Sequence, residues 1–363
     1  MLIKPILLSK KFLLPNIELD DTKLFLHHYN EKMELYIKEL SSLPQSAFID
    51  TDKAKFISRL KFIIENLKIT LSTYLDGHPA KAYKLFKEMI ENADPNLSTE
   101  LIYARTTTIN SDSIFYRVQK EYRPLKTFKG IKNGFSQVKN NIDLFHVPFQ
   151  NRKNIGTTRY SIPGFPCLYL AGSIHTSWSE CSLKDRDLFH AISFKNHRPL
   201  YLVDLVPLNF IIQENGGEIP DILYNKSDKN KIIIDYTYLF PLIFACHSKY
   251  KYNSKFTGEI QFKSEYIIPQ LLLQWYRDQK LIVDGIRYLS STSEDTFPTQ
   301  SFCKYNYVIP VTKCVDSGWC NDLLINFSST DVYSHVSNKS KQVMIDVLNN
   351  IESSLNKSLF SPL

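Results

Sequence analysis

Apolar residues recur every three or four positions through most of the first hundred residues, which is the period of an amphipathic helix. One such run covers 24–40 and a second covers 53–75. Pro79 suits the first turn of a third helix, because its missing N–H has no partner there in any case. The polar sequence at 94–96 (DPN) then breaks the pattern. We therefore expect a front region built from helices.

From about residue 113 the pattern changes to short apolar runs separated by polar, Gly- or Pro-containing stretches. Runs of this kind, rich in β-branched and aromatic residues, predict strands. We expect strands at 114–118, 167–171, 199–206, 286–289 and 304–311. We expect helices at 173–184, 232–250, 264–279 and 340–354. Asp284-Gly285 is expected to form a tight turn or bulge in strand material.

This order of elements predicts an α+β protein with an all-helical N-terminal domain. A doubly wound nucleotide-binding fold needs regular strand–helix alternation, which the chain lacks. The chain also lacks G-x-G-x-x-G and G-x-x-x-x-G-K-[ST], so neither a Rossmann dehydrogenase nor a kinase is expected. We divide the chain into a helical N-terminal domain at 1–110, a core domain at 111–325 and a C-terminal helical extension at 326–363.

Composition and charge restrict the class of protein only weakly. The 363 residues are 43% hydrophobic and 22% charged, as in ordinary globular proteins. The net charge of +7 would suit an anionic partner, but the excess Lys is spread along the chain, and a solvated surface explains it as well. We see no secretory signal and no apolar stretch of membrane-span length, so we expect a cytoplasmic protein that does not enter membranes.

The six cysteines are expected to be free thiols. Without an export route a disulfide framework is not favoured. Only Cys314 and Cys320 lie close together, and no second Cys pair or His pair completes a zinc site. We therefore expect no metal.

The chain's most informative stretch joins three residue types that chemistry uses. Arg159 precedes a Pro-Gly turn, Tyr169 lies inside a predicted strand, and Glu180 lies on the helix predicted to follow it. Glu180 stands between Trp178 and Cys181, in an apolar neighbourhood that disfavours casual exposure. From the residues alone, a salt bridge, a core tyrosine and a solvated carboxylate are the more common explanations of the three.

Two blocks of this sequence resemble the RES family, which is named for its Arg, Glu and Ser. The first is DLFHVPFQNRKNIGTTRYSIPGFPCLYLAGSIHTSWSE, at 143–180, and the second runs from 265 (EYIIPQ) through 290 (DGIRYLS). The resemblance covers about 113–315, and the helical front resembles the extension of longer members. It implies a fold related to ADP-ribosyltransferases, with a split, strongly bent β core around an NAD-binding cleft, and toxin-like enzymes that consume NAD.

The resemblance also assigns residues. Arg159, Tyr169, Glu180 and Ser290 correspond to the family's Arg, strand Tyr, Glu and Ser, and Arg117 matches a second recurrent Arg. Gln270 and Arg287 lie in the second block as further candidates. Leu289 stands where the family often has Pro, and Ser291 follows at once, so the functional Ser is either Ser290 or Ser291. His146 and His175 are not chosen, because an isolated His is more often structural.

The chemistry of NAD consumption suits these residue types. Cleavage of the nicotinamide–ribose bond develops positive charge on the ribose, which Glu180 could stabilise while it holds the ribose hydroxyls. Arg159 could bind the pyrophosphate through paired hydrogen bonds, and Arg117 could be a second phosphate ligand. Tyr169 could stack on the nicotinamide or adenine ring, and Ser290 could hydrogen-bond nicotinamide or ribose.

Three functions stay open at this point. The first is NAD degradation by phosphate or water, with NAD as the substrate, inorganic phosphate as a candidate co-substrate and no other cofactor. The second is transfer of ADP-ribose to a protein or nucleic acid. The third is nucleic-acid binding or regulation by the helical front, where related ribonucleases place a His four to six residues after an Arg. Neither Arg59 nor Arg105 is followed by such a His. An inhibitory antitoxin and self-association are the partners that the resemblance leaves open.

Overall fold

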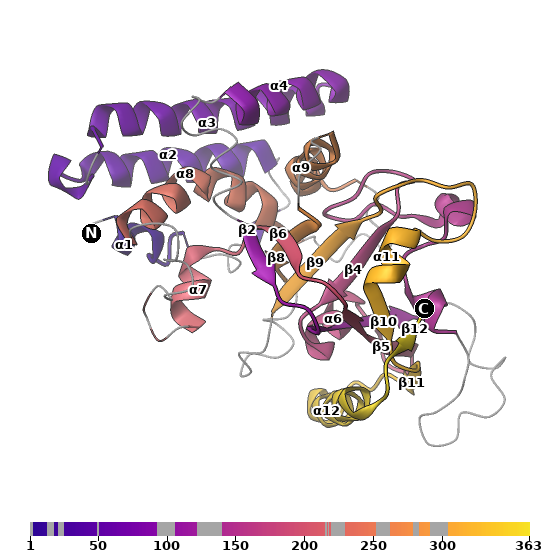
Figure 1. The fold of residues 1–363 in the computed structure, drawn as a ribbon. Helices are drawn as coiled ribbons and strands as arrows, with labels where there is room; N and C mark the ends of the chain where they lie inside the picture. Colours follow the sequence, from indigo (N-terminus) through magenta and orange to yellow (C-terminus); the bar gives the residue numbers. More distant parts are fainter. Residues whose placement is uncertain are drawn as a thin grey trace. The chain divides into compact units, whose positions relative to one another are not determined.

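The computed structural model describes residues 3–12, 18–20, 25–48, 51–92, 106–121, 140–214, 216, 218, 229–251, 262–278, 283–290 and 304–363. The chain divides into two compact units, whose elements are labelled in Figure 1. The helical unit comprises 1–105, 157–162 and 205–281, and the sheet unit comprises 106–156, 163–204 and 282–363. Each unit is thus assembled from three separate stretches of the chain.

Helices from the front and from the middle of the sequence build the helical unit (Figure 1). The long ones are α2 (Phe25–Ser42), α3 (Lys53–Leu75), α4 (Pro79–Asn92), α8 (Lys229–His247) and α9 (Ile267–Asp278). The helices expected at the front are confirmed. The shorter elements are α1 (Lys4–Leu7), β1 (Glu18–Asp20), η1 (Gln45–Ala47), α7 (Leu208–Glu214), β7 (Lys249–Lys251) and η6 (Ser264–Tyr266).

Aromatic packing holds α8 against the front helices. The Tyr36 and Phe240 ring centroids are 4.5 Å apart, and Phe56 and Tyr238 are 4.4 Å apart. The Tyr36 hydroxyl donates to the Thr237 carbonyl at 3.2 Å, so the buried phenol keeps a polar partner. Residues 205–281 therefore belong to the same compact unit as the N-terminal helices, so the contiguous domain boundaries expected from the sequence do not coincide with the compact units.

One mixed sheet forms the centre of the sheet unit. Its strands follow the order β12-β10-β5-β3-β4-β9-β8-β6-β2, and β11 also pairs with β5. In chain order they are β2 (Thr106–Ile109), β3 (Ile114–Lys120), β4 (Cys167–Ala171), β5 (Leu188–Asn196), β6 (Leu200–Asp204), β8 (Gly285–Leu289), β9 (Tyr305–Pro310), β10 (Phe327–Ser329), β11 (Tyr333–Val336) and β12 (Ser361–Pro362). The other elements are η3 (Asn141–Leu144), η4 (Phe149–Asn154), α6 (Ile174–Glu180), α11 (Asn321–Asn326) and α12 (Lys341–Lys357).

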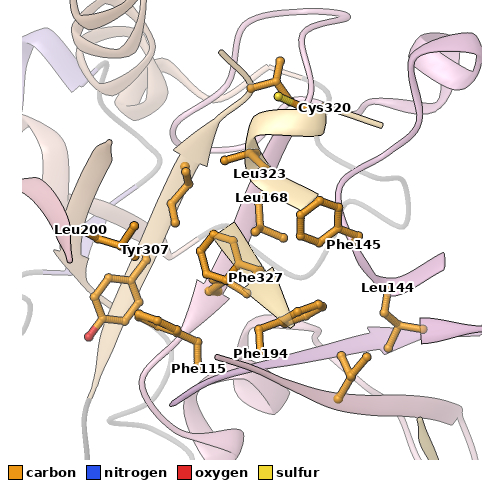
Figure 2. Packing of buried hydrophobic residues seen from close by; sticks show 14 of the residues in the cluster. Phe115, Leu144, Phe145, Leu168, Phe194, Leu200, Tyr307, Cys320, Leu323 and Phe327 are labelled. Carbon is orange, nitrogen blue, oxygen red and sulfur yellow. The ribbon is translucent and has the colours of Figure 1, made fainter. Parts of the chain in front are cut away.

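The two faces of this sheet carry different apolar clusters. The larger cluster includes Phe115, Leu168, Phe194 and Tyr307, and α11 packs into it through Leu323 (Figure 2). The other face carries a smaller cluster, in which α6 and α12 pack against β3 and β5. Its members include Tyr116, Val118, Ile174, Ala191 and Leu348. Successive residues of β3 thus alternate between the clusters, as strand geometry requires.

Gly285 lies inside a strand, which corrects the turn or bulge expected at Asp284-Gly285. It pairs with Leu202 of β6 in the parallel ladder. A Cβ at this position would lie 2.2 Å from the Val308 carbonyl oxygen of β9, so only glycine allows the two strands to approach this closely. Asp284 just before it accepts a hydrogen bond from the Tyr201 backbone N–H at 2.9 Å and so fixes the start of the strand.

The C-terminal residues belong to the main sheet, which corrects the helical extension expected at 326–363. β10 and β11 both pair antiparallel with β5, and β12 pairs with β10. Helix α12, expected at 340–354, is confirmed at Lys341–Lys357, and Ser340 caps it. The α+β class and the helical N-terminus are confirmed.

Candidate functional site

Glu180 is held by two buried side chains of the sheet unit. Its Oε1 accepts a hydrogen bond from the Ser290 hydroxyl at 2.6 Å and another from the Asn306 side-chain amide at 2.8 Å. Ser290 is fully buried and Asn306 is 4% exposed, whereas Glu180 itself is exposed. One oxygen of the carboxylate is therefore held by buried donors, while the side chain remains accessible to solvent. A carboxylate that served only as a solvated surface charge would not need such anchoring.

A short helix delivers Glu180 to this place. α6 begins after Ser173, whose side chain accepts the Thr176 N–H, and ends at Glu180, four residues before the end expected from the sequence. Ser182 has a φ of +47°, a conformation that does not continue a helix. Glu180 therefore occupies the last helical position, directly beside the turn.

Helix α6 is also bound to the edge of β3. The Ser177 hydroxyl accepts the Val118 N–H at 2.7 Å, and the Cys181 thiol donates to the Val118 carbonyl at 3.1 Å. Burial raises the pKa of Cys181 to about 12, so the thiol stays protonated and keeps this donor role. The β3–β4 ladder has one described pair, Tyr116–Ala171. Beyond that pair, the backbone N–H and carbonyl of Val118 form hydrogen bonds with Ser177 and Cys181 instead.

Strand alternation places Tyr169 on the same sheet face as Asn306. Tyr169 pairs with Val308, two positions from Asn306 on β9. Its neighbours Leu168 and Leu170 both belong to the larger cluster, so Tyr169 points to the opposite face. The half-buried ring and the Glu180–Ser290 pair therefore share the face that α6 covers.

Arg117 is a buried cation of β3. Its Nη1 is buried and has no hydrogen-bond partner among the residues that the structure describes. Burial lowers the pKa of Arg117, and the Cys181 and Tyr169 groups oppose this shift. Arg117 pairs with Ile192 of β5 in the antiparallel ladder. The structure shows no contact between Arg117 and Glu180.

Arg159 belongs to the helical unit, where it contacts the end of α8. Its Nη1 donates to the Cys246 and Ser248 carbonyls, both at 2.9 Å. The guanidinium lies 4.9 Å from the centre of the Tyr266 ring, a cation–π arrangement. A cation at this place complements the unpaired carbonyls of a helix C-terminus, so one nitrogen of Arg159 has a structural task.

Gln270 holds the same loop. Its side-chain amide donates to the Thr158 carbonyl at 3.0 Å, next to Arg159. The Ser161 hydroxyl accepts the Thr158 N–H at 3.0 Å and closes the loop on itself. Gln270 and Arg159 are therefore brought together within the helical unit, whereas Tyr169, Glu180 and Ser290 lie in the sheet unit.

Arg287 has a structural explanation. It makes two hydrogen bonds to Asp204, at 3.1 and 2.7 Å, and its guanidinium lies 4.7 Å from the centre of the Tyr305 ring. Asp204 is almost fully buried, and its charge raises the pKa of Arg287 in spite of burial. The Arg287–Asp204 ion pair links β6 to β8, and it occupies the guanidinium N–H groups that a ligand would need.

The two histidines set aside in the sequence both have structural partners. His146 Nε2 accepts the Cys320 N–H at 2.9 Å, and its Nδ1 lies 2.9 Å from the Val147 carbonyl. Burial lowers the pKa of His146 to about 4. His175 Nδ1 is 3.9 Å from a Glu352 carboxylate oxygen on α12, and burial lowers its pKa as well.

Asn306 is the residue that the sequence did not reveal. It lies in a strand that was expected, but a single Asn in an apolar run carries no motif. The signal that could have found it is its place directly before the run Tyr307–Val311, which is apolar and buried. Ser290 contacts Glu180, whereas Ser291 lies outside the described residues.

The cysteines in the described part of the chain are all free, as expected: Cys167, Cys181, Cys246, Cys314 and Cys320. Cys303 lies outside that part. Among the same described residues, no group of His, Cys, Asp and Glu is arranged to hold a metal ion. No helix in the described ranges is long and apolar enough to cross a membrane.

The chain has a recognisable relative. It is 32% identical over 316 residues to "Putative toxin YopC" of Bacillus subtilis (strain 168). The alignment covers 86% of this chain, and the chain spans 65% of that relative's length. No protein-family profile matches the chain, and no solved structure matches it.

Proposed function

We propose that this protein is a RES-type enzyme that cleaves the nicotinamide–ribose bond of NAD. The observation that carries the proposal is the Glu180 carboxylate, anchored through one oxygen by the buried Ser290 and Asn306 and exposed to solvent. This places the Glu and the Ser of the RES resemblance in direct contact, although 110 residues separate them in the sequence.

The chemistry follows from the charge that develops during cleavage. As the bond between ribose and nicotinamide breaks, its electron pair leaves with nicotinamide and the ribose gains oxocarbenium character. A carboxylate held in place before the reaction stabilises that charge without reorganising. Glu180 also accepts hydrogen bonds from ribose hydroxyls, and Tyr169, on the same sheet face, supplies a flat surface for a ring of the substrate.

Phosphate binding is assigned to Arg117 and Arg159, the two arginines that the RES resemblance names. Arg117 carries a buried Nη1 with no partner among the described residues, which an anion would satisfy. The hydrogen bonds of Arg159 Nη1 to the Cys246 and Ser248 carbonyls orient the guanidinium. Gln270 supports Arg159 by holding the neighbouring Thr158 carbonyl.

The acceptor distinguishes three reactions at one site. Water yields ADP-ribose, inorganic phosphate yields a phosphorylated ADP-ribose, and a macromolecule becomes ADP-ribosylated. The name of the B. subtilis relative contains the word toxin, and loss of NAD would be toxic to a cell. We therefore also propose a cytoplasmic, toxin-like role for this chain, with an inhibitory protein as a partner.

Product analysis tests the proposal. Purified protein is incubated with NAD in phosphate and in phosphate-free buffer, and nicotinamide and the ribose-containing product are identified by mass. Release of nicotinamide supports the proposal, and its dependence on phosphate identifies the acceptor. Labelled ADP-ribose on a protein would indicate transfer instead. Intact NAD in both buffers, with protein shown to be folded, would contradict cleavage by water and by phosphate.

A further inference from the structure

Asn306 is the second residue of β9, the strand that lies behind Glu180. On β9 it pairs with Ala171 of β4 on one side and with Tyr288 of β8 on the other. Its backbone is therefore held from both sides, and its side chain is 4% exposed. The position of its amide is thus set by the sheet and does not depend on a flexible loop.

The amide of Asn306 and the hydroxyl of Ser290 donate to the same atom, Glu180 Oε1. Two donors on one oxygen fix both the position of the carboxylate and its rotation. The structure gives Oε2 no hydrogen bond among the described residues, and the Glu180 side chain is exposed. Oε1 is therefore the anchored oxygen, and Oε2 is the one available to a ligand.

An amide suits this position better than its nearest alternatives. Aspartate would set a second carboxylate within hydrogen-bond distance of Glu180, where like charges repel. A hydrocarbon side chain would leave Oε1 with Ser290 as its one described donor. A buried amide placed to meet a carboxylate supplies a donor without adding charge, and a partly satisfied buried acceptor is costly.

We propose that Asn306 is a positioning residue, which orients Glu180 so that Oε2 meets the ribose of the substrate. The catalytic role inferred for Asn306 rests on the proposed NAD cleavage. The contact itself does not depend on that activity. Asn306 does not touch the substrate in this assignment and acts through Glu180 alone.

A double-mutant cycle tests the contact without any assay of activity. Asn306→Asp should lower the melting temperature at pH 7.5 by about 5–10 °C, because a buried carboxylate would then face the Glu180 carboxylate at hydrogen-bond distance. Glu180→Gln exchanges the donor and the acceptor of the pair, so the double variant should recover at least half of that loss. Non-additivity of this kind reports a direct interaction.

Asn196→Asp is the matched control. Asn196 is also a fully buried sheet asparagine, but its amide donates to the Asn110 and Arg198 carbonyls. Asn196→Asp should lower the melting temperature by the same amount whether residue 180 is Glu or Gln. If the drop in melting temperature caused by Asn306→Asp is also unchanged by Glu180→Gln, the inferred contact is overturned.

Kinetics separate the inference from the proposed function. In an active protein, Asn306→Ala should lower kcat about 10-fold or more and leave KM within about 2-fold, because the lost contact orients a catalytic group and does not bind substrate. An unchanged kcat in an active enzyme would overturn the positioning role. If the unmodified protein leaves NAD intact, the proposed function fails, while the stability cycle still decides whether Asn306 holds Glu180.

Discussion

The Ser290 hydroxyl lies 2.6 Å from Glu180 Oε1 and donates to it from a fully buried position at the end of β8. Glu180 comes from a helix that follows β4, so the contact joins two distant segments of the chain through the sheet. A carboxylate restrained in this way is prepared for charge stabilisation before any substrate arrives.

Removal of the Ser290 hydroxyl should therefore impair catalysis more than folding. We expect Ser290→Ala to lower kcat for NAD cleavage by about 100-fold, in the range found when a preorganised donor is lost. Ser179→Ala is the matched control, because Ser179 is buried on α6 beside Glu180 but donates to the His175 and Thr176 carbonyls. Steady-state rates of nicotinamide release measure both, and equal losses would argue against a specific role for Ser290.

Arg117 should show opposite effects on stability and on anion binding. A buried cation whose Nη1 has no hydrogen-bond partner among the described residues is costly, so Arg117→Met should leave the stability unchanged or raise it. If the guanidinium binds a substrate phosphate, the same change should weaken ADP-ribose binding by about 10- to 100-fold. Thermal shift with and without ADP-ribose measures both quantities. A destabilised variant that binds ADP-ribose normally would assign Arg117 a structural role.

Gly285 should tolerate no side chain. A Cβ at this position would lie 2.2 Å from the Val308 carbonyl oxygen, so Gly285→Ala forces β8 and β9 apart. We expect a loss of about 2–3 kcal/mol in the free energy of unfolding, as for other overpacked sites. Gly156→Ala is the control, because its Cβ would meet nothing within 4 Å. Denaturant titration of both variants tests the prediction, and a wild-type midpoint for Gly285→Ala would refute the close strand approach.

Acid should destabilise the protein through His146. Burial lowers its pKa in the folded chain to about 4, below the value near 6.5 of an unfolded histidine. Between these values the unfolded chain binds more protons, so the free energy of unfolding should fall by about 3 kcal/mol as the pH drops from 6.5 to 4.

The variant His146→Gln isolates this contribution. Glutamine keeps an acceptor for the Cys320 N–H but has no proton to gain. The dependence of unfolding free energy on pH between 4 and 6.5 should be shallower in the variant than in the wild type. Identical curves would show that His146 does not carry the acid sensitivity.

Local patterns predict the front helices well, because α3 has an N-cap at Asp52, apolar positions at helical spacing and a stop at Asp76-Gly77. They do not predict β5, which is buried almost throughout and includes His190, Ser193 and Asn196. Strand alternation disappears when both faces are covered, and the polar residues make the segment look like a loop. Only tertiary partners, such as Ser334 for His190, satisfy those groups.

The candidate site divides in the same way. The RES resemblance assigns Glu180 and Ser290 to one site, and the two side chains are in contact in the structure. Asn306 escaped notice because its role depends on the register of β9 against β4 and β8, which no local pattern records. Arg287 had the residue type and place of a ligand, but the pairing of β8 with β6 provides Asp204 as its partner.

The rate of nicotinamide release from NAD, compared between the unmodified protein and Glu180→Gln, tests the central claim most directly. Glutamine preserves the shape of the side chain and can still accept hydrogen bonds from Ser290 and Asn306, so folding should be retained. We predict measurable release by the unmodified protein and a loss of at least about 100-fold in the variant. No release by the folded, unmodified protein, or an equal rate in the variant, would contradict the assignment of Glu180 as the catalytic carboxylate.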